Sequence, residues 1–168
     1  KDTVHMLEFY GDALVMRHFQ QGAPQEAAKW ASIPVINAGD GWGEHPTQVL
    51  TDLYTVQSQT GSIDGKTFVC IGDHRMRTMH SIGYALSQFD AEMVILAPEE
   101  MSPTKEFLAE LDELGTSWRI VDHIDEVIAE VRILLSQTRD QFRRVLIERA
   151  GERGVTRALL GRRAQVDA

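Results

Sequence analysis

The sequence has little of several features that would point to particular classes of protein. It has a single cysteine, Cys70, which excludes an intrachain disulfide, and the apolar run FVCIG around it indicates a buried thiol. No apolar run approaches the roughly 20 residues that a membrane-spanning helix needs, so we expect no membrane partner. With 17 basic and 25 acidic residues, the formal charge of -8 argues against a nucleic-acid partner. These observations favour a cytoplasmic, reduced setting.

The pattern of apolar residues predicts an α/β fold. Of the 168 residues, 43% are hydrophobic and 25% are charged, which is typical of a soluble globular domain. We expect strands at residues 13–16, 34–37, 67–72, 93–97, 117–121 and 131–135. Helices are expected at residues 3–10, 24–31, 46–59, 77–89, 103–114, 124–130, 140–150 and 156–163. Strands that alternate with helices predict parallel sheets flanked by helices, with ligands bound beyond the carboxyl ends of the strands.

The stretch NAGDGWGEHPTQVLTDLYT, residues 37–55, combines a glycine-rich loop with the start of a helix. Its three glycines allow sharp turns that bring polar groups close to a small ligand. Pro46 suits the first helical turn, which puts His45 and Gln48 near the helix N-terminus. Such an end suits an anionic ligand. On its own, His45 could equally be a capping or surface histidine.

Three further segments put polar side chains after predicted strands. Arg17 and His18 follow ALVM, Arg77 and Thr78 open a helix within IGDHRMRTMHS, and Arg139 and Gln141 lie in SQTRDQF. A guanidinium suits a phosphate or a carboxylate. The plainer alternatives are a surface arginine at position 17 and a basic helix start after residue 138. The loop at residues 72–81 lacks the glycine spacing of a nucleotide-binding motif.

The sequence of residues 35–55, VINAGDGWGEHPTQVLTDLYT, resembles the carbamoyl phosphate signature of the aspartate carbamoyltransferases, with HPTQ at its centre. The resemblance implies that Arg17 contacts carbamoyl phosphate and helps to orient the second substrate. It implies that His45 donates a hydrogen bond to the carbonyl oxygen of carbamoyl phosphate, and that the Gln48 region holds the carbamoyl amide. Phe19 stands where the family often has proline.

The other two segments resemble the parts of this family that bind L-aspartate. Residues 72–81 are similar to GD-x-RTVHS, which implies a carboxylate-binding role for Arg77, with Thr78 beside it. A glycine that usually precedes the Arg-Thr pair is absent, so Arg75 is a possible substitute. SQTRDQF is similar to TR-x-Q, which implies that Arg139 and Gln141 bind carboxylates of aspartate.

The resemblance also implies a domain organisation. Residues 1–60 are expected to be part of a carbamoyl phosphate-binding domain, including a long helix that joins it to the rest. Residues 61–168 are expected to be most of an aspartate-binding domain, incomplete at its C-terminal side. The chain then corresponds to an internal segment, about the central half of the catalytic polypeptide, without the family's Ser-Thr-Arg-Thr and HPLPR segments. We expect this piece alone to fold poorly, and the complete protein to form a homotrimer.

The function that the resemblance implies is carbamoyl transfer from carbamoyl phosphate to L-aspartate, giving N-carbamoyl-L-aspartate and phosphate in de novo pyrimidine biosynthesis. No organic cofactor is expected. His74, His80 and His123 lack cysteine or carboxylate partners at metal-ligand spacing, so no metal is expected. The alternative is a non-catalytic carbamoyltransferase-like module that acts as a scaffold or binds a partner. That alternative is motivated by the missing Ser-Thr-Arg-Thr phosphate loop, by a loop before Arg77 that is one residue shorter than in the family, and by Phe19 after His18.

Overall fold

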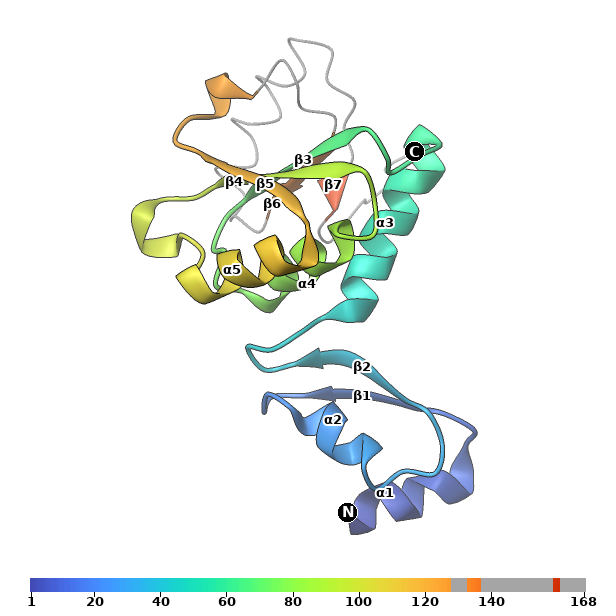
Figure 1. The fold of residues 1–168 in the computed structure, drawn as a ribbon. Helices are drawn as coiled ribbons and strands as arrows, with labels where there is room; N and C mark the ends of the chain where they lie inside the picture. Colours follow the sequence, from blue (N-terminus) through green and yellow to red (C-terminus); the bar gives the residue numbers. More distant parts are fainter. Residues whose placement is uncertain (128–132, 137–158, 161–168) are drawn as a thin grey trace, which may run out of the picture.

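The strands form two parallel sheets of different size (Figure 1). The computed structural model describes residues 1–127, 133–136 and 159–160. In the smaller sheet, β1 (Leu14–His18) pairs with β2 (Val35–Asp40). In the larger sheet, the strand order is β5-β4-β3-β6-β7, formed by Lys66–Ile71 (β3), Ala91–Leu96 (β4), Ser117–Val121 (β5), Ile133–Ser136 (β6) and Leu159–Leu160 (β7). All the described pairings are parallel, which confirms the predicted α/β class.

The smaller sheet is accompanied by two short helices, α1 (Asp2–Leu7) and α2 (Ala23–Ala28), and by the 3-10 turn η1 (Glu8–Tyr10). The register between β1 and β2 shifts near their carboxyl ends, because Met16 pairs with Asn37 whereas His18 pairs with Asp40. The extra residue on β2 is a bulge beside Gly39, whose φ of 116° is a conformation that favours glycine. Bulges of this kind change the direction of neighbouring side chains, and this one lies where the candidate site begins.

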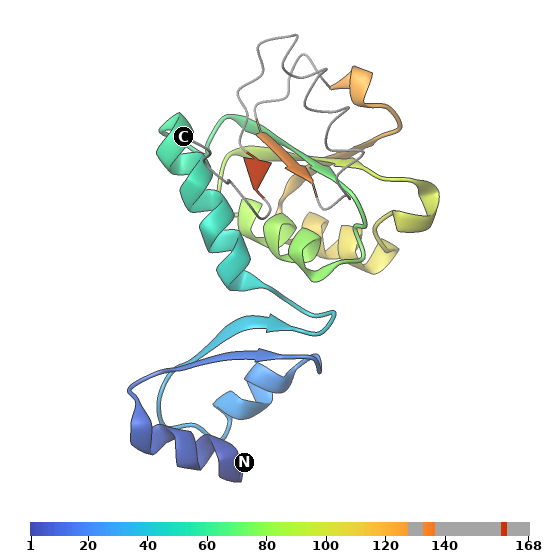
Figure 2. The same ribbon diagram turned by 180° about the vertical axis from the view of Figure 1, so that it is seen from behind.

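The long helix α3 (Pro46–Thr60) connects the two sheets, as Figures 1 and 2 show from opposite sides. Pro46 suits its first turn, and Gly61, with a φ of 78°, ends it in the left-handed conformation. Val49, Leu53 and Val56 follow helical spacing and are buried in the core of the larger sheet. The helix predicted at residues 46–59 is therefore confirmed, and its apolar face packs against the larger sheet.

The central residues of β3 and β4 are buried on both faces of the larger sheet. Alternate residues of β3 and β4 point to opposite sides, so Phe68 and Met93 pack under α3, α4 (Arg77–Leu86) and α5 (Lys105–Leu114), whereas Val69 and Val94 pack with Val121 and Val127 on the other face. Cys70 is fully buried, as predicted, and burial, followed by the nearby Asp52 carboxylate, raises the pKa of its thiol to about 12. Among the described helices, none has the length and apolar character needed to cross a bilayer.

Three sequence predictions are wrong in detail. Arg17 and His18 do not follow β1 but are its last two residues, because pairing with β2 continues to Asp40. The helix predicted at 124–130 begins instead as the 3-10 turn η3 (Ile124–Glu126). Within the helix predicted at 156–163, Leu159 and Leu160 form β7, because their backbone pairs with β6. The helix predicted at 140–150 lies outside the described residues.

The start of α5 offers a first test of the fold. Thr104 precedes the helix, and its hydroxyl oxygen accepts a hydrogen bond from the backbone N–H of Phe107 at 3.2 Å. Replacing Thr104 with alanine is expected to lower the free energy of unfolding of the full-length protein by about 1 kcal/mol, because an orphan N–H loses its cap. Urea unfolding measures the loss, and faster amide exchange at Phe107 localises it. Thr104→Ser keeps the hydroxyl and serves as the control; a loss as large as that of Thr104→Ala would contradict the capping role.

Candidate functional site

The loop between β2 and α3 is built around the buried carboxylate of Asp40. Its oxygens accept hydrogen bonds from the backbone N–H of Gly22 at 2.8 Å, from Asn37 Nδ2 at 3.1 Å and from the N–H of Glu44 at 2.6 Å. Burial by itself would raise the pKa of Asp40, but the donated hydrogen bonds outweigh it and hold this pKa below its usual value. Gly43 packs directly on the carboxylate, since a β-carbon there would lie 2.9 Å from both carboxylate oxygens. Asp40 therefore fixes the path of the loop.

His45 stands at the end of this loop, immediately before α3. Its backbone N–H donates to Ser81 Oγ at 2.9 Å, and its ring lies next to Gly39, where a β-carbon would be 3.2 Å from His45 Cδ2. Burial lowers the pKa of His45, and the positive charges of Arg77 and Arg17 lower it further. The ring is therefore neutral at pH 7 and carries one proton that it can donate.

Arg77 begins α4 and reaches across to the loop of the smaller sheet. Its Nη1 donates to the carbonyl oxygen of Gly41 at 2.8 Å. A β-carbon at Gly39 would lie 3.3 Å from the Arg77 guanidinium carbon, so Arg77 and His45 border the same small space. The loop after β2 and the start of α4 thus bring together two of the side chains that the motifs indicate, His45 and Arg77.

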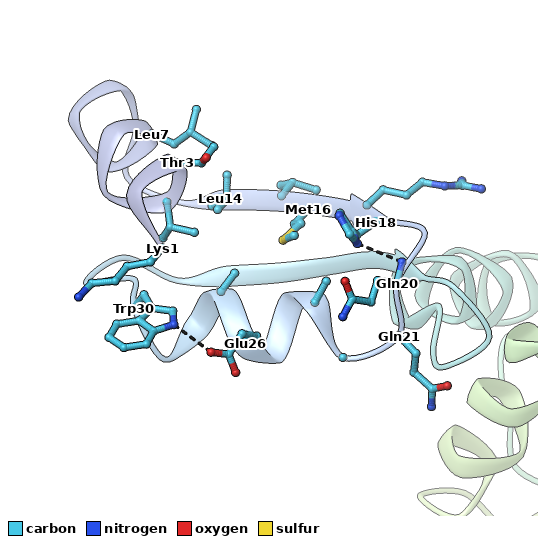
Figure 3. A pocket seen from close by; sticks show the side chains of 16 residues that line it. Lys1, Thr3, Leu7, Leu14, Met16, His18, Gln20, Gln21, Glu26 and Trp30 are labelled. Atoms are coloured by element: carbon cyan, nitrogen blue, oxygen red, sulfur yellow. Dashed lines mark hydrogen bonds between the residues drawn. The ribbon is translucent and has the colours of Figure 1, made fainter.

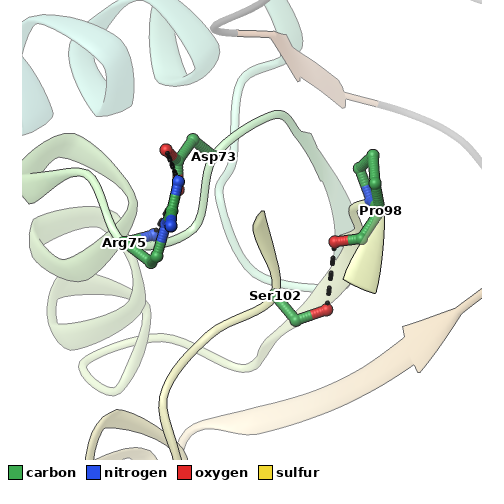
Figure 4. Close-up of polar contacts among 4 residues, drawn as sticks. All are labelled: Asp73, Arg75, Pro98 and Ser102. Atoms are coloured by element: carbon green, nitrogen blue, oxygen red, sulfur yellow. Dashed lines mark hydrogen bonds and ion pairs between the residues drawn. The ribbon is translucent and has the colours of Figure 1, made fainter. Parts of the chain in front are cut away.

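Arg75 is held elsewhere. Its Nε and Nη2 each donate to a carboxylate oxygen of Asp73 at 2.7 Å (Figure 4). The same figure shows Ser102 donating to the carbonyl oxygen of Pro98 at 3.3 Å in the loop after β4. The ion pair with Asp73 leaves Arg77, and not Arg75, as the arginine that contacts the 40–45 loop in the described structure.

The remaining predicted site residues lie around this centre or outside the described residues. Arg17, at the end of β1, is close enough to His45 to affect its pKa. Gln48 lies in the first turn of α3, and its Nε2 donates to Asp52 Oδ1 at 2.8 Å. Thr78 Oγ1 is buried and has no hydrogen-bond partner within the part of the chain that the structure describes. Arg139 and Gln141 lie outside the described residues.

Comparison with known proteins identifies the family. The model for the aspartate/ornithine carbamoyltransferase carbamoyl-P binding domain matches residues 1–58, and the model for the Asp/Orn binding domain matches residues 64–149. The chain belongs to the aspartate/ornithine carbamoyltransferase family.

Relatives within this carbamoyltransferase family are substantially longer than the chain. The chain is 44% identical over 136 residues to the aspartate carbamoyltransferase catalytic subunit of Thermoplasma acidophilum. This match covers 79% of the chain and 44% of that protein. The chain is 35% identical over 175 residues to the catalytic subunit of Methanopyrus kandleri, covering 99% of this chain and 55% of that protein. The chain therefore spans about half the length of the curated relatives that it matches.

A solved carbamoyltransferase structure has the same fold. Aspartate transcarbamoylase from Trypanosoma cruzi, in complex with N-(phosphonacetyl)-L-aspartic acid, superposes with a TM-score of 0.76 at 36% identity. The match covers 89% of this chain and 52% of that chain. Both the order of the elements and their packing are therefore shared with this enzyme over the matched part.

Two residues of this candidate site are not indicated as site residues by the sequence motifs. Glu44 and Ser81 meet between the loop and α4, where the Ser81 hydroxyl donates to Glu44 Oε2. Ser81 lies one helical turn after Arg77, and this spacing is a signal that both side chains share one face of α4. Glu44 carries no comparable signal, because its partner is 37 residues away along the chain.

Two other features of the chain are a pocket and a buried histidine. A pocket runs along β1 between α1 and α2, and Arg17 is the one predicted site residue among those that line it (Figure 3). His74 is fully buried, and its Nε2 lies 3.0 Å from the carbonyl oxygen of Cys70. Burial lowers the pKa of His74 to about 4, so this ring is neutral and donates to that oxygen. Within the described ranges, no group of three or more His, Cys, Asp or Glu residues is arranged to hold a metal ion.

Proposed function

We propose that the full-length protein transfers the carbamoyl group of carbamoyl phosphate to the amino group of L-aspartate, giving N-carbamoyl-L-aspartate and phosphate. The observation that carries the proposal is the meeting of His45 and Arg77 around Gly39. One is a neutral hydrogen-bond donor and the other a fixed cation, and they come from the two regions matched by the two domain models. The Trypanosoma cruzi relative binds N-(phosphonacetyl)-L-aspartic acid, which joins a phosphonate to an aspartate moiety.

The proposed reaction needs positioning and electrostatic stabilisation, and no organic cofactor. The amino nitrogen of aspartate attacks the carbonyl carbon, the bond from that carbon to the phosphate oxygen breaks, and the amine loses a proton. The carbonyl oxygen gains negative charge as the tetrahedral centre forms, so a donor aimed at it stabilises the transition state more than the ground state. His45 is the proposed donor. Thr47 Oγ1 lies 3.4 Å from His45 Nδ1, and a hydroxyl donating there would leave the ring proton on Nε2.

The other roles follow the resemblance residue by residue. In this proposal Arg17 contacts carbamoyl phosphate, Gln48 holds its amide, and Arg77 binds an aspartate carboxylate with Thr78 beside it. Arg139 and Gln141 are proposed to bind the aspartate carboxylates as well. Residues 1–60 then supply the carbamoyl phosphate side of the site, and residues 61–168 supply the aspartate side.

The proposed setting of the reaction is the cytoplasm, in de novo pyrimidine biosynthesis, with the full-length protein as a homotrimer. The trimer is proposed because sites of the resembled family are shared between subunits. The single cysteine is buried and fits a reducing compartment.

Calorimetric titration of the full-length protein with N-(phosphonacetyl)-L-aspartate tests the proposed function. Binding is expected in the wild type, and His45→Ala is expected to weaken it by about 10- to 100-fold, which corresponds to losing one hydrogen bond to a polar or charged group. His123→Ala removes an exposed histidine from the loop after β5 and is expected to bind normally. A folded wild-type protein that binds nothing would favour the non-catalytic module.

A further inference from the structure

Ser81 of α4 joins the loop of the smaller sheet to the helix of the larger sheet. Its Oγ accepts the backbone N–H of His45 at 2.9 Å and donates to Glu44 Oε2. Ser81 is nearly fully buried, with 6% of its surface exposed, so water does not readily replace these bonds. The two partners are consecutive residues of the loop, whereas Arg77 lies one turn earlier on the same helix.

The direction of these hydrogen bonds is fixed by the groups involved. A backbone N–H can only donate and an ionised carboxylate can only accept, so the single hydroxyl proton of Ser81 must point to Glu44. The lone pairs of Ser81 Oγ are then free to accept from His45. Glu44 is itself anchored, because its N–H donates to Asp40 Oδ1 at 2.6 Å and its carbonyl oxygen accepts the Asp40 N–H at 3.1 Å.

We propose that Glu44 and Ser81 are positioning residues, which hold the backbone of His45 against the first turn of α4 and so set the placement of the His45 ring relative to Arg77. Neither residue needs to touch a substrate for this role. The proposal rests on the proposed function, because it concerns the same site. It adds that the ionised form of Glu44 is the form that orients the Ser81 hydroxyl.

The surroundings of Glu44 make its ionisation sensitive to pH near neutrality. Burial raises the pKa of Glu44 to about 6, and repulsion from Asp40 on its own loop and from Glu110 on α5 raises it further. The hydrogen bond from Ser81 acts in the opposite direction and lowers this pKa. Tyr84 of α4 also faces this group and donates to Glu110. Below about pH 6 the protonated carboxyl of Glu44 can donate to Ser81 Oγ. The Ser81 hydroxyl proton then no longer has to point to Glu44, so the orientation of this hydroxyl beside the His45 N–H is no longer fixed.

The test compares Ser81→Ala with Ser87→Ala in the full-length protein. Ser87 follows the same helix. Its hydroxyl donates to the carbonyl oxygen of Tyr84 at 2.7 Å and accepts from Gln88 Nε2 at 3.0 Å, and neither partner belongs to the 40–45 loop. In Ser81→Ala we expect the His45 amide to exchange with solvent about tenfold faster or more, since its buried acceptor is lost. We expect kcat for carbamoyl transfer to fall by about tenfold with little change in KM, because the donor to the transition state is misplaced. Ser87→Ala is expected to change neither quantity.

A second variant keeps the proposal falsifiable if Ser81→Ala fails to fold. Glu44→Gln preserves an amide oxygen that can accept from Ser81 but cannot be titrated. The wild type is expected to lose kcat as the pH falls through about 6, and Glu44→Gln is expected to lack this inflection. Unchanged His45 exchange in Ser81→Ala, or an identical inflection in Glu44→Gln, overturns the proposal. Faster His45 exchange in a protein without carbamoyl transfer would support the positioning and overturn the proposed function.

Discussion

Replacing Arg77 with alanine is expected to weaken binding of N-(phosphonacetyl)-L-aspartate to the full-length protein by about 30- to 4,000-fold, because truncating one partner of a buried charge pair costs roughly 2–5 kcal/mol. The Arg77 guanidinium borders Gly39 beside the His45 ring, and its Nη1 donates to the Gly41 carbonyl oxygen at 2.8 Å. A guanidinium can form two parallel hydrogen bonds with a carboxylate or a phosphonate. Calorimetric titration measures the loss directly.

Two control variants make the Arg77 experiment specific. Arg77→Lys keeps the positive charge but cannot form two parallel hydrogen bonds with one carboxylate, so an intermediate loss of affinity is expected. Arg75→Ala removes an exposed arginine that already pairs with Asp73, and it is expected to bind nearly as tightly as the wild type. If Arg75→Ala weakened binding more than Arg77→Ala, Arg75 would be the carboxylate-binding arginine, and the assignment to Arg77 would be wrong.

Replacing Asp40 with alanine is expected to lower the free energy of unfolding by about 3–5 kcal/mol, because donors that now reach a carboxylate would be left buried without an acceptor. Three such donors converge on the side chain, from Gly22, Asn37 and Glu44. Urea unfolding of the full-length protein at pH 7 measures the change. Asp40→Asn retains one acceptor oxygen and is expected to lose less; an Asp40→Ala variant as stable as the wild type would show that the loop does not depend on this carboxylate.

The same carboxylate has a predictable pH signature. The pKa of Asp40 is lower in the folded protein than in an unfolded chain, so its contribution to stability is complete at neutral pH. That contribution is lost as the pH falls below about 4, where the unfolded carboxyl group begins to bind a proton. The Asp40→Asn variant has no carboxyl group to protonate at this position. Its free energy of unfolding is therefore expected to fall less steeply than that of the wild type in this pH range.

The sequence predicted the layered part of the fold well, because periodicity reports burial directly. The helix at 46–59 has Val49, Leu53 and Val56 at helical spacing, and these are the residues that the core contains. Strand ends were less predictable. Arg17 and His18 are polar, yet they belong to β1 because backbone pairing with β2 does not depend on side-chain polarity.

The candidate site was predictable in its local parts but not in its contacts between the two sheets. His45 and Arg77 stand in recognisable motifs, so the sequence alone indicates both residues. The sequence motif leaves either Arg75 or Arg77 as the arginine of the site. Only the structure distinguishes them, because it pairs Arg75 with Asp73. The bond between Glu44 and Ser81 spans 37 residues and two elements, and no local pattern encodes such a pairing.

The packing of α3 has a consequence for motion. Since Val49, Leu53 and Val56 are buried in the core of the larger sheet, we expect α3 to move with that sheet. The residues that separate Asp40 from Pro46 are bonded to Arg77 and Ser81 of α4, which belongs to the same layer. We therefore expect any change in the angle between the two sheets to alter the distance between His45 and Arg77 as well.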